Sequence, residues 1–368
     1  MMEVKRMSGE LQVTPELRKQ AAEENAAALQ RLGLKPDVVE VWEDGYRTAE
    51  EADAFEWWYF DAQLDDGSTA VITFSTKPHT KPKGPLSPVV LIIFRTRDGE
   101  RFSHAPKFVP ADLSASTEQC DVRIGPNWVR GDLASYELHV EAEDIAIDLS
   151  LQREGPSWRP GAAVSYFNSA KTKYFAWVVP VPYGKVKGTI TRGGKPVAVQ
   201  GTVYHDHNWG NAVMGNMLDH WFWGRAHVGD FSIIFAQLVT IKIFGLGGIK
   251  LPVFFLAKGD RILTDDGLPL ILETSDEVDG PKGQTYPTKL DFRWEDEGGK
   301  VELAIRNPKL IEVLDMTEDM PAWKKPLVHI FANPLYYDFD AELELSVDLA
   351  GVKEQQSGRV IFEKMIFH

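Results

Sequence analysis

Nine consecutive residues near the middle of the chain, 202–210, concentrate ionisable and aromatic side chains as no other stretch does. If this segment is a β-strand, successive side chains point to opposite faces. Two sets then result, with His205, His207 and Trp209 on one face and Tyr204, Asp206 and Asn208 on the other. Neither set forms a plain apolar face. Such a strand must line a cavity, bind a metal ion or feed a hydrogen-bond network.

Two other short segments have a similar character. Residues 56–60 read Glu-Trp-Trp-Tyr-Phe, and residues 221–227 read Trp-Phe-Trp-Gly-Arg-Ala-His. The three segments together hold 5 of the 11 Trp residues in the chain. This concentration favours an aromatic, partly polar pocket. The alternative is that each segment is an ordinary core strand of a Trp-rich barrel.

These motifs, in this order, resemble the AttH-type, carotenoid-hydratase (hydroxyneurosporene synthase) family, which includes the lipocalin-like Diels–Alderases of polyketide pathways. The matching residues are Glu-Trp-Trp-Tyr-Phe at 56–60, Tyr-His-Asp-His-Asn-Trp-Gly-Asn at 204–211 and Trp-x-Trp-Gly-Arg at 221–225. The resemblance covers roughly residues 40 to 368. It implies a fold of two lipocalin-like antiparallel β-barrel or sandwich domains. It does not imply one reaction, because family members hydrate, cyclise or have no assigned activity.

The composition is that of a globular protein, with 368 residues, 43% hydrophobic and 26% charged. A chain of this length can form two domains. The 40 basic and 54 acidic side chains give a formal net charge of −14. Such a balance argues against nucleic acid and against an anionic membrane surface as partners. The acidic residues are scattered, which is typical of a solvated surface.

Cys120 is the only cysteine, so an intramolecular disulfide is excluded and a reducing compartment is expected. Neighbouring carboxylates in Glu-Gln-Cys-Asp argue against a nucleophilic thiolate. The N-terminus shows no apolar signal segment. The most apolar stretch, 231–257, is interrupted by Lys242, Lys250 and Pro252, so no membrane-spanning segment is expected. We therefore expect a cytoplasmic protein.

The organisation of the chain predicts an all-β fold with one short N-terminal helix. Thr14-Pro15-Glu16 is a helix start, 17–32 is rich in Ala, and Gly33 ends the helix. Strands are then predicted at 69–75, 89–95, 136–140, 145–151, 231–239 and 341–347. Turn signals separate them at 65–67, 98–99, 193–194, 266–267 and 298–299. Many short strands at this spacing indicate antiparallel sandwiches or barrels.

The predicted domains are an N-terminal extension (1–37), an N-terminal β domain (38–198) and a C-terminal β domain (199–368). A weak internal repeat supports a duplicated fold, since four residues recur 164 positions later. The pairs are Trp57 with Trp221, Tyr59 with Trp223, Asp66 with Asp230, and Ser68 with Ser232. We expect the functional site between the two β domains, because the first motif lies in one and the other motifs lie in the second.

The sequence predicts no cofactor and no metal ion. Neither a Gly-x-Gly-x-x-Gly nor a Walker loop is present, and the Gly-x-Ser-x-Gly elbow of a Ser-His-Asp hydrolase is also missing. His205 and His207 could bind a metal from one face of a strand. A third ligand, from Glu56, His220 or His227, would have to come from a distant segment.

Acid–base chemistry without a cofactor is the favoured interpretation. Protonating an alkene requires a carboxylic acid kept protonated by burial, with aromatic rings to stabilise the cation. The predicted catalytic residues are Asp206, His207 and Glu56, where His207 would orient the acid, relay its proton or position water. The predicted substrate-binding residues are Trp58, Tyr59, Tyr204, Trp209, Trp221, Trp223 and Arg225.

Structural roles remain open for several of these side chains. Asp206 points away from His207 on a regular strand and could be a buried acceptor for backbone amides. Glu56 could instead pair with an arginine such as Arg225. His205 could be a hydrogen-bonded core or rim residue, and Tyr204 a packed ring with a bonded hydroxyl.

Three functions fit these features. The first is an enzyme that hydrates a C=C bond of a long hydrophobic isoprenoid or polyene. The second is a cyclase or Diels–Alderase-type pericyclase, which needs a shaped apolar cavity rather than an acid. The third is a carrier of hydrophobic ligands without catalysis. The substrate and the oligomeric state are not determined by the sequence.

Overall fold

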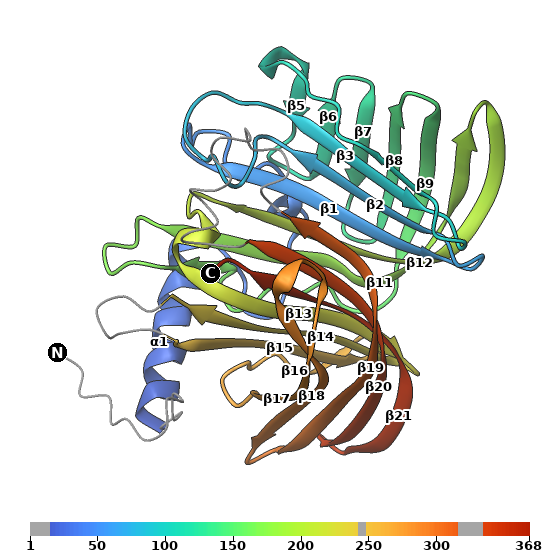
Figure 1. Cartoon of the computed structure of the whole chain (residues 1–368). Helices are drawn as coiled ribbons and strands as arrows, with labels where there is room; N and C mark the ends of the chain where they lie inside the picture. Colours follow the sequence, from blue (N-terminus) through green and yellow to red (C-terminus); the bar gives the residue numbers. More distant parts are fainter. Residues whose placement is uncertain (1–14, 242–247, 316–333) are drawn as a thin grey trace. The chain divides into compact units, whose positions relative to one another are not determined.

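Two antiparallel sheets make up most of the structure, and each belongs to its own unit (Figure 1). The computed structural model describes residues 15–241, 248–315 and 334–368. The N-terminal unit comprises Ala22–Val213, and the C-terminal unit comprises Met214–His368 with the beginning of the N-terminal helix. The predicted all-β class with one N-terminal helix is confirmed.

The sheet of the N-terminal unit has twelve strands in the order β4-β3-β2-β1-β12-β11-β9-β8-β7-β6-β5, with β10 paired to β11. Its strands are β1 (Phe55–Leu64), β2 (Thr69–Ser75), β3 (Val89–Arg95), β4 (Arg101–His104), β5 (Leu113–Ala115), β6 (Cys120–Ile124), β7 (Asn127–Gly131), β8 (Ser135–Ala142), β9 (Ile145–Arg153), β10 (Val164–Tyr166), β11 (Tyr174–Arg192) and β12 (Lys195–Gly210). The predicted domain boundary at 198/199 falls inside β12 of this sheet.

The sheet of the C-terminal unit has nine strands in the order β16-β15-β14-β13-β21-β20-β19-β18-β17. Its strands are β13 (Leu218–Val228), β14 (Phe231–Thr240), β15 (Lys250–Lys258), β16 (Arg261–Thr264), β17 (Ile271–Asp279), β18 (Thr285–Asp296), β19 (Gly299–Asp315), β20 (Leu335–Leu349) and β21 (Val352–Ile366). On β20, Leu343, Leu345 and Val347 are buried while Glu342 and Glu344 alternate with them, as the sequence predicts.

The helical elements are few and short. They are α1 (Pro15–Leu32) and four 3₁₀ turns, η1 (Val41–Asp44), η2 (Pro110–Asp112), η3 (Met214–Asn216) and η4 (Pro281–Gly283). α1 ends where the sequence predicts, because Gly33 adopts the left-handed conformation (φ 70°) that favours glycine. The predicted capping residue Thr14 lies outside the described residues.

The two sheets share one topology. In each, four consecutive strands run in descending order to the first strand of the unit, and that strand pairs with the last strand of the same sheet. β1 and β13 are therefore equivalent strands, and the repeated aromatic residues lie on them. Trp57 and Tyr59 of β1, like Trp221 and Trp223 of β13, lie on the face opposite their own unit's apolar core.

The strands form where β-branched and aromatic residues alternate with polar ones. In β2, Ala70, Ile72 and Phe74 are buried in the core of the N-terminal unit, and the residues between them are half-buried. The six predicted strands all lie within or along described strands, and β2 and β3 match their predicted bounds. One core per sheet is the result.

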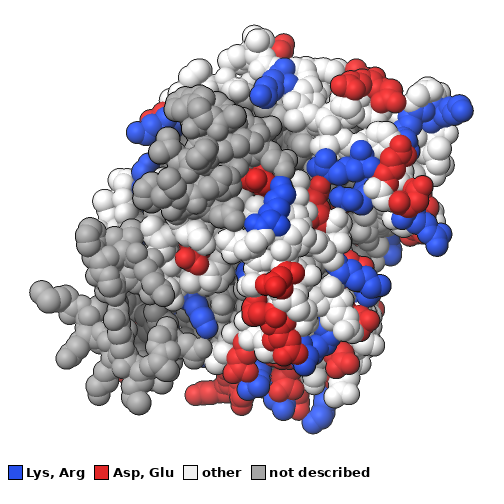
Figure 2. All heavy atoms as spheres, in the orientation of Figure 1, with Lys and Arg blue, Asp and Glu red and all other residues white. Residues whose placement is uncertain are grey.

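The described surface carries both signs of charge. Acidic and basic side chains are interspersed in the view of Figure 2, in keeping with an acidic excess that is scattered along the sequence. Among the described helices, none has the length and apolar character needed to cross a bilayer.

We predict that the core of the C-terminal unit sets its stability. Ile305 of β19 is fully buried, whereas Ile271 of β17 is 48% exposed. Ile305→Ala should lower the free energy of unfolding by about 2–5 kcal/mol, since it leaves a cavity. The matched control Ile271→Ala should change it by less than about 0.5 kcal/mol. If urea denaturation shows the same loss in free energy of unfolding for both variants, this assignment of the core is wrong.

Candidate functional site

Strand β12 presents different chemistry on its two faces. It pairs with β1 so that His207 lies opposite Trp58 and His205 lies opposite Phe60. Each imidazole stacks on its opposite ring, with centroids 4.6 Å apart for His207 on Trp58 and 4.0 Å for His205 on Phe60. Trp58 and Phe60 belong to the core, so the two histidines face inward. Asp206 lies on the opposite face, and the predicted alternation is confirmed.

The inward face holds a buried tetrad of Asp44, Glu56, His205 and His207. His207 Nε2 lies 2.7 Å from Glu56 Oε1, and its Nδ1 lies 3.3 Å from Asp44 Oδ1. His205 Nε2 lies 3.1 Å from Asp44 Oδ2. None of the four side chains is more than 1% exposed. Asp44 therefore bridges the two imidazoles.

Further donors hold the two carboxylates of the tetrad. Glu56 accepts the backbone N–H groups of Arg47 and Thr48, each at 2.8 Å, and the Thr48 hydroxyl at 2.7 Å. Asp44 accepts the Tyr136 hydroxyl at 2.6 Å. Counting His207, four groups of the protein thus contact the one carboxyl group of Glu56. Glu56 is thereby bound without an arginine side chain.

Each ring nitrogen of His205 and His207 lies close to an oxygen atom. The Tyr59 carbonyl can only accept, so the His205 Nδ1 that lies 2.9 Å away carries hydrogen, and Nε2 faces a carboxylate. Burial opposes a charge on His207, but Asp44 and Glu56 outweigh burial and raise its pKa. Burial likewise opposes a charge on Asp44, yet His205 and His207 hold its pKa well below the usual range. Asp44 and His207 thus stabilise each other's charged form.

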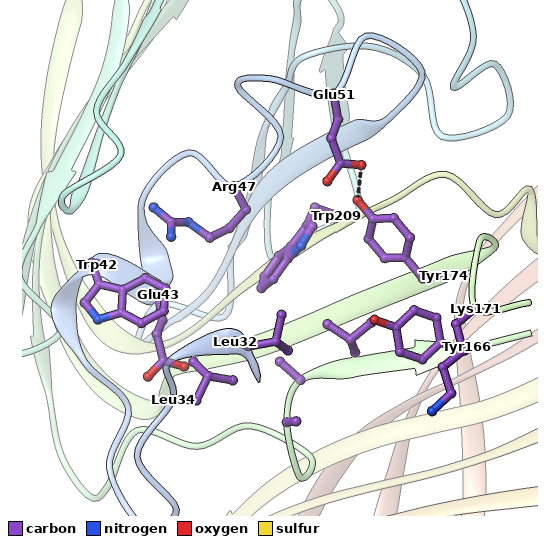
Figure 3. Close-up of a pocket in the computed structure, with 13 residues that line it drawn as sticks. Leu32, Leu34, Trp42, Glu43, Arg47, Glu51, Tyr166, Lys171, Tyr174 and Trp209 are labelled. Atoms are coloured by element: carbon purple, nitrogen blue, oxygen red, sulfur yellow. Dashed lines mark hydrogen bonds between the residues drawn. The ribbon is translucent and has the colours of Figure 1, made fainter. Parts of the chain in front are cut away.

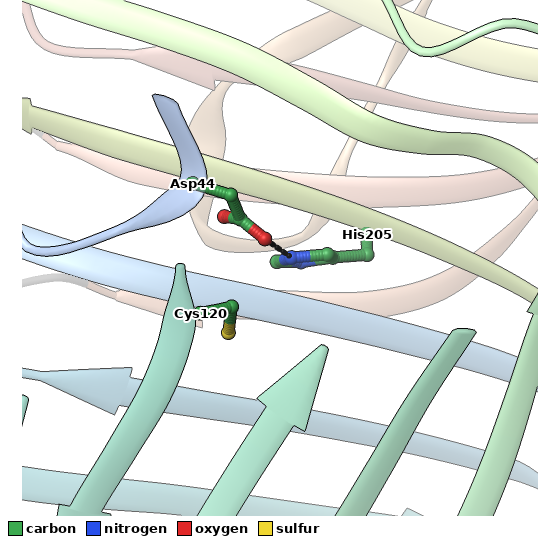
Figure 4. A group of neighbouring side chains, drawn as sticks. All are labelled: Asp44, Cys120 and His205. Atoms are coloured by element: carbon green, nitrogen blue, oxygen red, sulfur yellow. Dashed lines mark hydrogen bonds and ion pairs between the residues drawn. The ribbon is translucent and has the colours of Figure 1, made fainter. Parts of the chain in front are cut away.

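A potential metal-ligand group lies at one end of the tetrad. Ligand atoms of Asp44, Cys120 and His205 lie within 4.8 Å of one another (Figure 4). A metal ion binds thiolate, but burial and the charge of Asp44 raise the pKa of the Cys120 thiol well above its usual value. Both nitrogens of His205 already face oxygen acceptors. This donor set fits a hydrogen-bond network better than a metal site.

The outward face of the same strands carries what we call the outer wall: Trp57, Tyr59, Trp177, Tyr204, Asp206 and Asn208. Asp206 accepts the Tyr204 hydroxyl at 2.8 Å, the Trp177 indole N–H at 3.2 Å and the Asn208 amide at 2.7 Å. Its donors are side chains, not the backbone amides of the structural alternative. Burial raises the pKa of Asp206 to about 6, against the opposing effect of these donors.

A cavity of about 380 Å³ lies near the end of β12 (Figure 3). Its lining is aromatic, aliphatic and charged, and consists of Leu32, Leu34, Trp42, Glu43, Arg47, Glu51, Ala162, Ala163, Val164, Tyr166, Lys171, Tyr174 and Trp209. The Tyr174 hydroxyl donates to Glu51 at 2.6 Å. The Trp209 ring lies 5.0 Å from His207, so Trp209 separates the cavity from the tetrad.

The predicted site residues thus fall into separate places. His207 contacts Glu56 and lies on the opposite face from Asp206. Trp58 is fully buried in the core, and its indole N–H donates to the Asp44 carbonyl at 3.0 Å. Tyr59 and Tyr204 lie on the outer wall with ring centroids 6.3 Å apart.

The third motif lies on β13 of the C-terminal unit. Trp221, Trp223 and Arg225 are half-buried and alternate with the core residue Phe222. The Trp221 indole donates to Glu363 at 2.6 Å. These residues therefore lie together on one face of a strand.

Sequence reasoning missed Asp44 and Trp177. Asp44 is 161 positions from His205 and lies in a 3₁₀ turn, and nothing in the Trp-Glu-Asp-Gly segment around it points to a histidine. Trp177 lies in an apolar stretch of β11, whose only signal is its place in a strand adjacent to β12. Strand pairing brings Trp177 to the site, and the fold of the turn η1 brings Asp44 there; neither position is indicated by the local sequence pattern.

Fold and site together define a two-unit, lipocalin-like β protein with a buried acid–imidazole network and an adjoining aromatic wall. The AttH-like family model matches residues 47–310, and the chain belongs to this family.

Relatives with recorded activities match only part of the chain. The quinolone epoxide rearrangement protein penF of Penicillium thymicola is 26% identical over 217 residues, which are 51% of this chain and 57% of penF. The hydroxyneurosporene dehydrogenase of Chlorobaculum tepidum is 27% identical over 214 residues, 50% of this chain and 56% of that protein. The matches thus span little more than half the length of these relatives.

Solved structures share the fold over most of the chain. An AttH protein of Nitrosomonas europaea superposes with a TM-score of 0.61 at 18% identity, covering 90% of this chain and 99% of that one. CghA with Sch210972 gives 0.62 at 15%, covering 90% and 96%. Kievitone hydratase of Nectria haematococca gives 0.52 at 13%, covering 90% and 97%. These likenesses establish the lipocalin-like fold.

We predict that Asp44 is the most sensitive member of the tetrad. Asp44→Asn leaves two buried imidazoles without their shared counter-charge, and should lower the free energy of unfolding by about 3–5 kcal/mol. The control Asp219→Asn breaks the 2.6 Å contact with His220 on half-exposed side chains, and should cost less than about 1 kcal/mol. Similar midpoints of thermal unfolding for the two variants would show that the tetrad adds no stability.

The raised pKa of Asp206 predicts a pH-dependent stability. The pKa is about 6 in the folded protein and about 3.9 in an unfolded chain, so the folded state binds the proton more tightly. This stabilisation is present below pH 4 and is lost as the pH rises through 6. Relative to wild type, Asp206→Asn should therefore gain up to about 3 kcal/mol between pH 4 and pH 7.

Urea denaturation across this pH range measures the difference. The exposed control Asp260→Asn should stay parallel to wild type. A difference between Asp206→Asn and wild type that does not change with pH would mean that Asp206 titrates normally.

Proposed function

We propose that this protein is an enzyme that starts its reaction by protonating a hydrophobic, isoprenoid or polyene substrate at the outer wall, with hydration of a C=C bond as the overall reaction. The supporting observation is the carboxyl group of Asp206, which is 8% exposed and whose pKa is raised by burial to about 6. A carboxyl group with this pKa is half protonated near pH 6, and the protonated fraction at neutral pH is far larger than for an ordinary aspartate. No metal ion or organic cofactor is required for this chemistry.

Asp206 is favoured over Glu56 as the acid. Glu56 is completely buried, and its two carboxyl oxygens are already contacted by four groups of the protein. Asp206 is the less enclosed of the two and lies beside the half-buried ring of Tyr59. In this proposal His207 and Glu56 have a supporting role, because they fix β1 against β12 from the inward face.

The surrounding rings suit a cationic intermediate. Trp57 and Tyr59 lie on the face of β1 that carries the outer wall, and Trp177 bonds Asp206 directly. Aromatic faces stabilise a nearby cation by about 0.5–2 kcal/mol each. A proton moves from Asp206 to one alkene carbon, and the π electrons form the new C–H bond. The carbocation then accepts the oxygen of water, which loses a proton to give the alcohol.

A second candidate function is cyclisation or rearrangement, and the cavity beside Trp209 supports it. Four aromatic side chains line this cavity, Trp42, Tyr166, Tyr174 and Trp209, and Asp206 does not. A shaped cavity can accelerate ring closure by holding a polyene in a reactive conformation. The names of penF and kievitone hydratase record a rearrangement in one relative and a hydratase in one structural neighbour. A carrier of hydrophobic ligands is the third candidate.

Substitutions at two positions, Asp206 and Trp209, separate these functions. If Asp206 is the acid, Asp206→Asn should lower the rate about 10²–10⁴-fold with little change in binding, while Trp209→Phe has a modest effect. If the cavity drives cyclisation, Asp206→Asn should be nearly silent and Trp209→Ala should damage rate or stereoselectivity most. Asp61 is a second buried carboxyl group, on the face of β1 that carries Tyr59. Asp61→Asn therefore tests whether Asp206, rather than Asp61, is the acid.

A screen in D₂O supplies the activity for these comparisons. Compounds with a terminal isoprenoid double bond, such as geranylacetone, are incubated with the protein, and products are analysed by mass spectrometry. Protonation of carbon must place deuterium on carbon. A product without new C–D bonds would rule out the proposed reaction, and binding without any product would favour the carrier.

A further inference from the structure

The segment between β2 and β3, residues 76–88, places a histidine at the end of the outer wall. The His79 ring lies 5.7 Å from Trp57 and 6.3 Å from Phe55, centroid to centroid. Phe175 of β11 completes this cluster, 5.8 Å from Trp57. Phe55 and Trp57 lie on the same face of β1 as Tyr59, so His79 lies over the face that carries Asp206.

A buried lysine fixes this segment. Lys77 is 2% exposed, and its ammonium donates to the carbonyls of Ala52 at 2.7 Å, Pro82 at 3.1 Å and Gly84 at 2.7 Å. The segment is also tied to β1, where the Thr76 N–H donates to the Glu56 carbonyl at 2.9 Å and the Glu56 N–H donates to the Thr76 hydroxyl oxygen at 3.0 Å. His79, two residues from Lys77, is therefore held in place by the fold.

The imidazole of His79 is available for a ligand. Neither ring nitrogen has a hydrogen-bond partner among the described residues, and the side chain is half-buried rather than enclosed. This contrasts with His205 and His207, whose four ring nitrogens all face oxygen atoms. Burial lowers the pKa of His79, so the ring is neutral at pH 7 and one nitrogen offers a lone pair.

The position of His79 complements that of Asp206. Trp57, under His79, is two residues from Tyr59, which lies opposite Asp206. Two residues along a strand span roughly 7 Å. His79 lies beside Trp57 and Asp206 lies opposite Tyr59, so both groups lie along one face of β1 and β12. An acid and a base placed on one face can act on the same substrate, as in enzymes whose acid and base flank the reacting bond.

We propose that His79 is a further catalytic residue, the general base that activates water for addition to the carbocation formed by Asp206. The inference rests on the proposed function. The water oxygen donates an electron pair to the carbocation and forms the C–O bond. His79 accepts the proton that this oxygen loses, and solvent returns a proton to the Asp206 carboxylate. The balance is one alkene and one water molecule giving one alcohol.

Two substitutions at position 79 test the proposal with geranylacetone in D₂O. His79→Phe retains an aromatic ring in the cluster, and His79→Gln retains a polar group without the base. Both should lower the rate of alcohol formation by at least about 10²-fold. Deuterium should still enter the recovered alkene, because the cation returns its proton when water is not activated. Unchanged alcohol formation in both variants would overturn the role of His79.

This readout separates the two proposals. Asp206→Asn should abolish deuterium uptake into alkene and alcohol alike, whereas the His79 variants should abolish only the alcohol. If Asp206→Asn keeps full deuterium uptake, the proposed acid is wrong. If deuterium uptake falls equally in the His79 variants, His79 is needed for the shape of the wall rather than for water.

A chemical probe tests the availability of His79 without any substrate. Diethyl pyrocarbonate acylates neutral, accessible imidazoles, and mass spectrometry locates the modified peptide. His79 should react in the native protein, while His205 and His207 stay unmodified until unfolding. Protection of His79 to the same degree as His205 would overturn the proposal, whichever substrate the protein uses.

Discussion

The alternation of side chains along β12 is the constraint on which this structure depends. A strand that places His205 and His207 inward must supply them with counter-charges inside an apolar core, since an unpaired buried charge costs several kcal/mol. Asp44 and Glu56 provide these charges. Thr48 and two backbone amides donate to Glu56, and Tyr136 donates to Asp44 Oδ2, whereas Asp44 Oδ1 has no hydrogen-bond partner among the described residues. The same alternation places Asp206 on the other face, where its neighbours are neutral donors and aromatic rings. One strand thus separates a network of paired acids and imidazoles from a carboxyl group whose pKa is raised by burial.

This separation explains how a rigid site and an unusual pKa can coexist. On the inward face, a 2.7 Å contact between His207 and Glu56 joins β12 to β1, and contacts of 3.1 and 3.3 Å with Asp44 join β12 to η1. The register of these strands also positions the outer wall. Asp206 is hydrogen-bonded there to the neutral side chains of Tyr204, Trp177 and Asn208. Solved structures share the fold at low identity, and the names of penF and kievitone hydratase record different reactions. We therefore propose that side chains of the wall and the cavity determine the reaction, while the strands behind them maintain the common fold.

The sequence predicted what depends on local pattern. Alternation indicated the two faces of 202–210, and turn residues indicated the bounds of β2 and β3. The repeated Trp57 and Trp221 lie on strands at equivalent places in the two sheets. The sequence could not predict contacts set by register between distant segments. Asp44 reaches His205 across 161 positions, and His79 reaches Trp57 only because Lys77 holds the segment that carries it. The sequence also could not predict that Trp58 is buried in the core rather than substrate-binding, because a Trp in such a motif is compatible with either place.

The most direct test of this account is a titration of individual carboxyl groups by NMR. The protein is labelled with ¹³C at the aspartate side-chain carboxyl, and signals are assigned with Asp206→Asn and Asp44→Asn. The Asp206 signal should inflect near pH 6. The Asp44 signal should remain that of a carboxylate down to a pH below the usual pKa range of aspartate. An Asp206 signal that inflects at or below the ordinary value of about 3.9 would contradict the claim that the outer wall holds a protonated acid.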